Sequence, residues 1–453
     1  MKISINFVDC MKWEKLLSDK RFGMESYHDE SKHERTDFQR DYDRLIFSAP
    51  FRRLQNKTQV FPLPGSVFVH NRLTHSLEVA CVGRSLGDMC GKQLFKSSKQ
   101  ECSALLEMGS IVSAACLAHD LGNPPFGHSG EKAISTYFSE GNGKEWIEIL
   151  KRQEERITDF THFEGNANSL RLLTHQFNGR RKGGFAMTYS TLSSIVKYPY
   201  SSLSCDPEKG KFGFFASEES DYKKIAGELG LLKISESPVR YVRHPLVYLV
   251  EAADDICYQI MDIEDAHKLK LLSTEECIEL MFNFFPEEKK KRTRSIMDMV
   301  DDKNEKIAYL RSSVIGLLIN ECCRVFVENE KFILRGKFEK SLIKYIGETP
   351  KSAYATCAEI SKEKIYRSQI VVDIELAGFR IISFLLDCLL DAVRDPGKKY
   401  SELLIERIPE QYEKSNVKDY TKTQAVVDYI SGMTDIYALD LYRKITGMSL
   451  PSL

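Results

Sequence analysis

The chain has 453 residues, 42% of them hydrophobic and 28% charged, and its formal net charge is -1. This balance does not indicate a dedicated nucleic-acid-binding protein, although it leaves room for a local basic groove. No apolar run approaches the roughly 20 residues of a membrane-spanning helix, and the N-terminus lacks a signal-peptide pattern. The 12 cysteines show no C-x-x-C spacing, so they indicate reduced thiols and neither a disulfide framework nor a zinc ribbon. We therefore expect a cytoplasmic protein without a membrane partner.

Hydrophobic periodicity predicts an all-α fold. Apolar residues recur at helical spacing along most of the chain, in the segments 73–94, 103–120, 131–138, 164–177, 188–197, 245–268, 302–330 and 359–395. Strand signals are sparse and short; the best candidates are 57–61, 66–69 and 331–337, and the turn-like Pro62–Gly65 could join the first two into a hairpin. Residues 204–220 read as a long loop, and such loops are usually functional or mobile. A soft boundary near residue 270 divides the chain into 1–270 and 271–453.

His119 and Asp120 form the most informative pair in the sequence. They end the apolar helical run 113–118, and the loop that follows, 121–128, is rich in glycine and proline. Because the two side chains are adjacent at a helix end, both can reach one cation. A buried carboxylate beside an imidazole is costly unless something compensates it, and a metal ion would do so.

Two further segments supply partners for this pair. His75 lies at the start of a predicted helix, whereas Asp254 and Asp255 lie in the middle of another, flanked by apolar residues. Two carboxylates in such a helix are locally inconsistent with a structural role. Asp254, Tyr258 and Asp262 are spaced by four, so they share one helix face. Taken by itself, His75 would be interpreted as a residue on a helix surface. Asp254 by itself would be interpreted as the ion-pair partner of an arginine.

Two histidines and two aspartates would make a mixed nitrogen and oxygen site. Such a site suits Mg, Mn, Co, Fe or Zn and leaves open positions for water and a phosphate oxygen. The pattern leaves open whether Asp254 or Asp255 is the fourth ligand.

His128 and Glu131 are candidates for acid–base chemistry. They are spaced by three and open the helix after the glycine-rich loop, so they lie on one helix face. An imidazole oriented by a carboxylate is the usual form of a general acid or base. The alternative is a capping role, in which Ser129 or Glu131 only stabilises the start of the helix. His162, at the start of another predicted helix, has the same two interpretations.

Basic residues near these segments are candidates for holding phosphates. Arg72 is carried three residues before His75, and Lys197 precedes Tyr198 and a proline that ends a helix; a plain surface lysine is the alternative for Lys197. Neither G-x-x-x-x-G-K-[ST] nor G-x-G-x-x-G occurs, which argues against P-loop and dinucleotide-binding chemistry. Residues 83–87 match G-x-S-x-G inside a helical pattern, so we interpret that match as chance.

Together these segments resemble the HD-domain metal phosphohydrolases, and more closely the dGTPase-like deoxynucleoside triphosphate triphosphohydrolases among them. The H…HD…D pattern alone is weakly specific for this family, whereas the sequences that flank its residues are much more specific. The resemblance is carried by residues 52–61, 71–79, 118–128, 162–167 and 251–256. It spreads over residues 40–268, and the C-terminal third resembles the family only as a helical tail, most visibly at Tyr366–Gln369.

The resemblance implies a role for each candidate. The metal ligands would be His75, His119, Asp120 and Asp254. Asp254 is preferred to Asp255 because its spacing to Tyr258 and Asp262 follows the family. The catalytic residues would be His128 and Glu131, with His162 near the α-phosphate. The phosphates would be contacted by Arg72, Asn166, Lys197, Tyr198 and Tyr258, and the sugar 3′-hydroxyl by Gln59 and Asp262. Asn123 departs from some relatives, which have a histidine there, so its role stays open.

The implied function is metal-dependent hydrolysis of deoxynucleoside triphosphates, dGTP among them, to the deoxynucleoside and inorganic triphosphate. The cation would ready a water molecule for attack on the α-phosphorus, and arginine and lysine would neutralise charge on the triphosphate. One alternative is another HD phosphohydrolase, acting on nucleoside monophosphates or guanosine polyphosphates. The other is a non-catalytic HD nucleotide sensor or single-strand nucleic-acid binder.

The resemblance also implies domain roles and partners. Residues 1–270 would form the HD-type core with an N-terminal substrate-binding segment. Residues 271–453 would form a helical region that completes the fold and supplies an oligomer interface. We expect a homo-oligomer, a hexamer or a tetramer, with a nucleotide effector and single-stranded DNA as further candidate partners.

Overall fold

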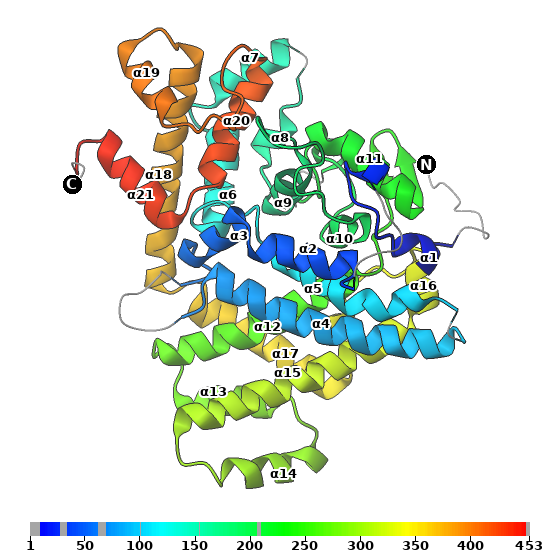
Figure 1. Ribbon diagram of the computed structural model, residues 1–453. Helices are drawn as coiled ribbons and strands as arrows, with labels where there is room; N and C mark the ends of the chain where they lie inside the picture. Colours follow the sequence, from blue (N-terminus) through cyan, green and yellow to red (C-terminus); the bar gives the residue numbers. More distant parts are fainter. Residues whose placement is uncertain are drawn as a thin grey trace.

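The computed structural model describes residues 10–27, 34–61, 69–99, 101–153, 155–205 and 210–449. Of these residues 66% are helical and 3% are in β-structure, which confirms the expected all-α class. Figure 1 shows three helices across the middle of the molecule, α2 (Asp37–Ile46), α4 (Arg72–Ser97) and α5 (Met108–Ala118). Three others stand at one side, α6 (Gly127–Ser139), α18 (Gln369–Arg394) and α20 (Asp419–Ser431). Within the described ranges, no helix is both long and apolar enough to cross a membrane.

The other elements fall on both sides of residue 270. Before it lie α1 (Trp13–Leu16), α3 (Ala49–Arg53), α7 (Lys144–Arg152), α8 (Thr158–Thr161), α9 (Gly165–Thr174), α10 (Tyr189–Ser194), α11 (Glu219–Leu229) and α12 (Val247–Lys268). After it lie α13 (Thr274–Phe282), α14 (Glu287–Met297), α15 (Lys303–Glu328), α16 (Glu330–Leu334), α17 (Glu348–Ile360), α19 (Lys399–Glu406) and α21 (Asp435–Ile445). β1 (Lys233–Glu236) and β2 (Val239–Tyr241) form an antiparallel hairpin that pairs Lys233 with Tyr241 and Glu236 with Val239.

The helix pair α4 and α5 forms the centre of the fold. α4 begins with a capping box, in which Asn71 and Thr74 each accept the backbone N–H of the other through their side chains. α5 is buried on all sides, as expected of an apolar helix in the interior. The two helices approach closely at Gly87, where a Cβ would lie 2.7 Å from the backbone of Gly109. The G-x-S-x-G match at 83–87 therefore lies within a helix, where it forms part of a helix–helix contact.

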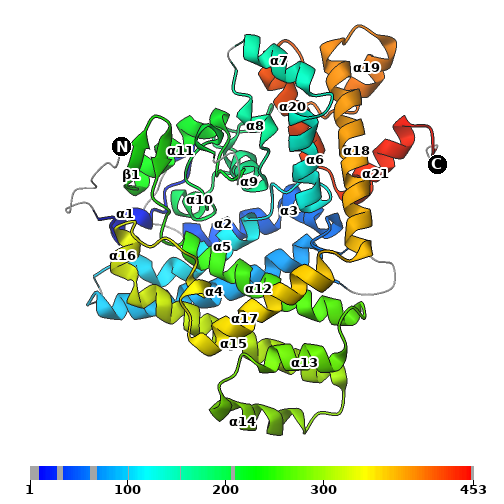
Figure 2. The same cartoon turned by 180° about the vertical axis from the view of Figure 1, so that it is seen from behind.

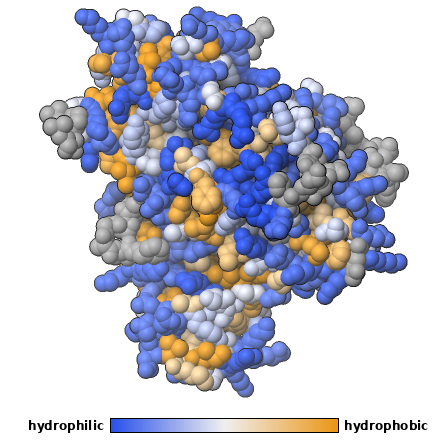
Figure 3. Space-filling view, in the orientation of Figure 1, coloured by the Kyte–Doolittle hydropathy of each residue, from blue (hydrophilic) through white to orange (hydrophobic). Residues whose placement is uncertain are grey.

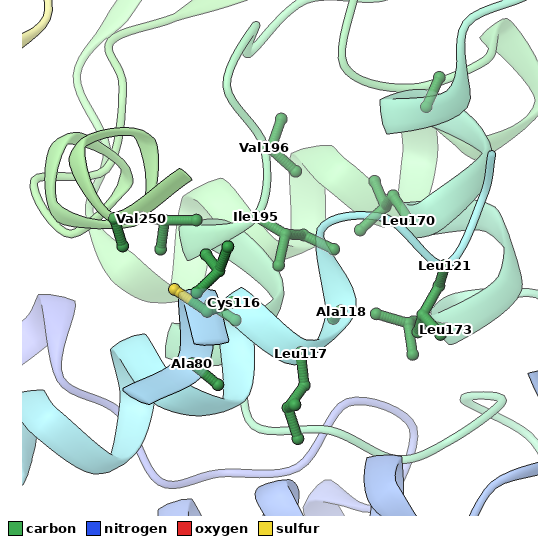
Figure 4. Packing of buried hydrophobic residues seen from close by; sticks show 14 of the residues in the cluster. Ala80, Cys116, Leu117, Ala118, Leu121, Leu170, Leu173, Ile195, Val196 and Val250 are labelled. Carbon is green, nitrogen blue, oxygen red and sulfur yellow. The ribbon is translucent and has the colours of Figure 1, made fainter. Parts of the chain in front are cut away.

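A hydrophobic core backs the end of α5. Figure 4 shows Ala80 of α4, Leu117 of α5, Leu170 of α9 and Val250 of α12 packed around this point. All four are nearly inaccessible to solvent. Protein cores pack as densely as organic crystals. This packing therefore holds the end of α5 rigidly, just before His119 and Asp120.

The C-terminal helices pack onto the same body. α15 lies against α4 and α12, and α18 lies along α6, as Figure 2 shows from behind. Large hydrophobic side chains are exposed on three of the last four helices, α18, α19 and α21, namely Ile370, Val372, Leu376, Tyr400, Leu403, Ile436 and Tyr437. Hydrophobic patches over these helices are visible at the upper left of Figure 3. The boundary near residue 270 and the oligomer interface stay predictions.

Two predicted strands are wrong. Residues 57–61 form only an isolated bridge, from Thr58 to Asn71, because the Thr58 N–H is bonded to the carboxylate of Asp435. Residues 331–337 contain most of α16. A helix satisfies its backbone hydrogen bonds within its own turns and here also buries Ile333. A single strand would need a second strand for its backbone hydrogen bonds. The third candidate, 66–69, lies outside the described residues apart from Val69, and so does its hairpin turn.

The predicted helix 359–395 is broken in two. A π-helical turn at Ser361–Ile365 follows α17, and the chain is extended at Ser368 before α18 begins. The break places the Tyr366 hydroxyl 2.6 Å from the carboxylate of Asp262, to which it donates. The other predicted helices are confirmed within a few residues, although 103–107 is a 3₁₀ turn.

Candidate active site

A cavity of about 260 Å³ opens where the end of α5, the start of α6 and α12 converge. All predicted site residues except His75, His162 and Asp262 line it. The lining consists of Gln59, Arg72, His119, Asp120, Asn123, His128, Glu131, Asn166, Ser194, Ile195, Lys197, Tyr198, Lys211, Val247, Val250, Glu251, Asp254 and Tyr258.

His75, His119 and Asp254 come together from α4, the end of α5 and α12. The Nε2 atom of His75 lies 3.1 Å from Oδ1 of Asp254, and Nε2 of His119 lies 3.6 Å from the same oxygen. One ligand atom of each residue lies within 4.8 Å of the other two. Two imidazole nitrogens and a carboxylate oxygen form a donor set that fits a divalent metal ion.

The hydrogen bonds of His119 leave its Nε2 atom free to bind a metal ion. Nδ1 lies 2.6 Å from the carbonyl oxygen of Cys116, so we assign the ring proton to Nδ1. Burial opposes positive charge on His119, but Asp120 and Asp254 outweigh it and raise its pKa to about 9. Burial also opposes the charge of Asp254, yet His119 and His75 hold its pKa well below the usual value. The cluster thus favours a positive charge beside Asp254. A bound metal ion would supply this charge in place of the protons on the two histidines.

Asp120 lies beside this cluster and is held by two other side chains. Its Oδ2 atom accepts from Nη1 of Arg72 at 2.7 Å, and its Oδ1 atom accepts from the Asn123 amide. Oδ1 also lies 3.6 Å from Nε2 of His119. Gly127 makes room for Arg72, since a Cβ there would collide with the guanidinium, and its φ of 57° suits glycine. Asn123, whose role the sequence left open, therefore helps to orient Asp120.

Of the two neighbouring aspartates, Asp254 contacts the histidines. Successive residues of a helix point about 100° apart, so Asp255 faces a different direction. Burial, together with Asp254 and Glu251, raises the pKa of Asp255 to about 7. This geometry favours Asp254 between the two alternatives.

His128 and Glu131 form a hydrogen-bonded pair in the first turn of α6. Nδ1 of His128 lies 3.2 Å from Oε2 of Glu131, and Oε1 of Glu131 accepts the N–H of Gly165 at 2.8 Å. Glu131 therefore orients His128 and caps α9. The bond to Glu131 raises the pKa of His128, which favours the imidazolium. The side chain of His128 is 70% exposed, so a substrate can reach it.

Lys211 adds a positive charge beside this pair. Its Nζ atom lies 2.6 Å from Oε2 of Glu164 and 3.9 Å from Oε2 of Glu131. Burial opposes the charge of Lys211, but Glu131 and Glu164 outweigh it and raise its pKa. Glu164 is the N-cap of α9 and also accepts from the amide of Asn166.

Lys197 is held in the cavity by Glu251. Its Nζ atom lies 3.0 Å from Oε1 of Glu251, whose other oxygen accepts from Arg243 at 3.3 Å. Burial opposes the charge of Lys197, but Glu251 outweighs it and raises its pKa. The ammonium lies 5.9 Å from the ring centre of Tyr198, within range of a cation–π contact.

Three predicted residues lie outside the cavity lining. His75 is buried and lies 3.1 Å from Asp254, which does line the cavity. His162 lines an adjoining hollow that shares His128, Glu131 and Lys211 with the cavity. Asp262 is buried beyond Tyr258, where it accepts from Tyr366; burial raises its pKa to about 7.

The sequence of this chain is similar to those of known proteins. Residues 72–196 match the HD domain, and residues 349–444 match the phosphohydrolase-associated domain. A deoxyguanosinetriphosphate triphosphohydrolase-like protein of Synechocystis sp. is 38% identical over 97% of this chain and 100% of its own length. The chain belongs to the dGTPase-like HD phosphohydrolases.

Other dGTPase-like proteins match nearly the whole chain. One from Listeria monocytogenes is 35% identical over 97% of this chain and 100% of its own length. A protein of Yersinia pseudotuberculosis, named deoxyguanosinetriphosphate triphosphohydrolase, is 30% identical over 90% of this chain and 93% of its own length. The family likeness therefore extends through the C-terminal third, beyond the residues 40–268 that the motifs indicated.

Sequence reasoning missed three charged residues of this dGTPase-like site. Lys211 lies in the predicted loop 204–220, whose length was the only signal of function. Glu251 lies three residues before Asp254, and Glu164 lies in the predicted helix start at 162–166. Each acts through a partner that is distant in sequence, and no local spacing reveals such a partner.

Proposed function

We propose that this HD phosphohydrolase uses a divalent metal ion to hydrolyse deoxynucleoside triphosphates, dGTP among them, to the deoxynucleoside and inorganic triphosphate. One observation carries the proposal: a metal-binding donor set, an oriented imidazole and several cations line or adjoin one cavity. The names of the full-length relatives support the same substrate class.

The residues that would hold the ion are His75, His119 and Asp254, with Asp120 beside them. When bound, the ion lowers the pKa of a water molecule and polarises a phosphoryl oxygen. Arg72 and Asn123 orient the carboxylate of Asp120. The hydrogen bond of His119 to Cys116 fixes its ring so that Nε2 faces Asp254.

His128 is the proton donor in this proposal. Release of inorganic triphosphate requires that water attacks the α-phosphorus and that the bond to the sugar 5′-oxygen breaks. The 5′-oxygen then needs a proton, and an imidazolium with a raised pKa can supply one near neutral pH. Glu131 keeps the ring oriented and favours its charged form.

The cations of the cavity suit a triphosphate better than a monophosphate. Arg72, Lys197 and Lys211 all line it, and each can neutralise a phosphate oxygen. Gln59 suits the sugar, because its Oε1 atom is buried without a hydrogen-bond partner among the described residues. A buried acceptor without a partner is unfavourable, and a sugar hydroxyl would donate to it.

The test is hydrolysis of each of the four dNTPs with Mn²⁺, followed by phosphorus NMR of the products. We expect inorganic triphosphate from the native protein and none from His128→Gln. His267→Gln serves as the control, since His267 bonds Thr274 and does not line the cavity. Release of pyrophosphate or single phosphate would contradict attack at the α-phosphorus, and turnover of monophosphates or guanosine polyphosphates alone would favour those substrates.

A further inference from the structure

The turn at Ser431–Asp435, which joins the end of α20 to the start of α21, contacts segments that carry active-site residues. Asp435, the first residue of α21, is 7% exposed, and each of its carboxylate oxygens accepts one backbone N–H. Oδ2 accepts from Thr58 at 2.8 Å, and Oδ1 accepts from Phe126 at 2.9 Å. One side chain near the C-terminus therefore joins two segments of the N-terminal half.

Both of these N–H groups stand just before residues of the cavity. Thr58 precedes Gln59, and Phe126 lies two residues before His128. Phe126 has a φ of 62°, in the left-handed region that a bulky side chain rarely adopts. Such a conformation persists where the surroundings hold it, and the bond to Asp435 is one such restraint.

Neighbouring contacts tie the loop after α5 to the same turn. Lys57 is buried and donates from Nζ to the carbonyl oxygens of Asn123, at 2.5 Å, and Ser431, at 2.9 Å. Asn168 of α9 donates to the carbonyl oxygen of Gly122, at 2.8 Å, and to the hydroxyl of Ser431, at 3.2 Å. The turn therefore also restrains the loop that follows Asp120.

α18 approaches Phe126 as well. A Cβ added at Gly378 would lie 2.9 Å from Cβ of Phe126, so the absence of a side chain lets the helix come this close. α18 and α21 both lie in the phosphohydrolase-associated domain, and yet no residue of that domain lines the cavity in the described part of the chain.

We propose that Asp435 is a positioning residue of the active site. It fixes the backbones of Thr58 and Phe126 and thereby sets the separation between Gln59 and the His128–Glu131 pair. Through Asp435 and Gly378, the associated domain orders the loop 121–128, although none of its described residues lines the cavity. The roles of Gln59 and His128 in this inference rest on the proposed function.

The test compares Asp435→Asn with the native protein. Asparagine keeps one acceptor oxygen but places an NH₂ group against the other backbone N–H, so one of the two bonds is lost. We expect kcat for dNTP hydrolysis to fall by about 10- to 100-fold, since small displacements of catalytic groups have effects of this size. Mn²⁺ should still raise the melting temperature as in the native protein, because His75, His119 and Asp254 are untouched.

Three further variants separate positioning from stability. Asp440→Asn makes the same chemical change on α21, at a residue whose carboxylate pairs with Lys444 on the helix surface, and should leave kcat unchanged. Ser273→Ala removes the cap of α13, outside this turn, and should lower the melting temperature with a native kcat. Gly378→Ala should lower kcat, because its Cβ would lie 2.9 Å from Cβ of Phe126 and must displace it; the overpacking should also lower the melting temperature, in part offset by the higher helix propensity of alanine.

Hydrogen exchange gives a readout that does not depend on activity. We expect the Phe126 or Thr58 amide to exchange about tenfold faster or more in Asp435→Asn, since each loses protection with its acceptor, and neither to change in Asp440→Asn. Native exchange at both amides, or a native kcat in Asp435→Asn, overturns the inference. If the native protein hydrolyses no dNTP, the proposed function fails, while hydrogen exchange still decides whether Asp435 holds these segments.

Discussion

The guanidinium of Arg72 lies 2.7 Å from the carboxylate of Asp120, and both side chains are almost fully buried. The sequence suggested a phosphate contact for the first and a metal ligand for the second. In the structure each compensates the charge of the other at the point where α4 begins and α5 ends. Burial opposes the charge of Asp120, but Arg72 and then His119 keep its pKa below the usual value.

Replacing Arg72 with methionine is expected to lower the free energy of unfolding by about 3 kcal/mol, because a buried carboxylate loses its partner. Urea unfolding measures this change. The double variant Arg72→Met/Asp120→Asn should lose less than the sum of the two single variants, by about 1 kcal/mol or more. Arg324→Met is the control: it breaks surface pairs with Glu321 and Glu328 and should cost about 1 kcal/mol or less. Strictly additive losses would show that Arg72 and Asp120 do not stabilise each other.

Asp254→Asn and Asp255→Asn form a matched pair of adjacent variants. Only Asp254 contacts His75 and His119, so only its replacement should abolish Mn²⁺ binding and Mn²⁺-dependent turnover. In the native protein, Mn²⁺ at about 100 times its Kd should stabilise the fold by about 2.7 kcal/mol, seen as a higher melting temperature. That rise should vanish in Asp254→Asn and persist in Asp255→Asn. The opposite result would assign the ligand to Asp255.

The sequence predicted the helices well, because α4, α5 and α12 carry strong apolar patterns. It also predicted that the side chains of His128 and Glu131 would meet, since three residues of spacing place them on one helix face, while their acid–base role stays a prediction. The shared face of Asp254, Tyr258 and Asp262 was less informative. Eight residues of helix span about 12 Å, so Asp262 lies past the cavity although it faces the same way.

Contacts between distant segments could not be predicted from one sequence. The pattern at 359–395 is helical throughout, and nothing local shows that the chain breaks to bring Tyr366 to Asp262. Likewise, the acceptor of the Thr58 N–H is the carboxylate of Asp435, which lies 377 positions away in the sequence.

Lys211→Met is expected to raise KM for a dNTP by about tenfold with a smaller change in kcat, because it removes one charge-assisted phosphate contact. Steady-state kinetics measures both constants. Lys223→Met is the matched control, since Lys223 pairs with Glu219 on the surface and should leave KM unchanged. An unchanged KM in Lys211→Met would mean that Lys211 serves only to neutralise Glu164 and Glu131.

Glu131→Gln should move the alkaline limb of the pH profile to lower pH. The hydrogen bond to Glu131 raises the pKa of His128 in the native protein, so the imidazolium persists to higher pH than in an isolated histidine. If His128 donates the proton, kcat/KM is high below this raised pKa and falls as the pH rises through it. Glutamine still accepts the N–H of Gly165 but carries no charge, so the pKa of His128 drops and activity is lost earlier. The profile of kcat/KM against pH, measured for both proteins, decides the matter: a limb that stays in place or moves to higher pH would assign it to another group.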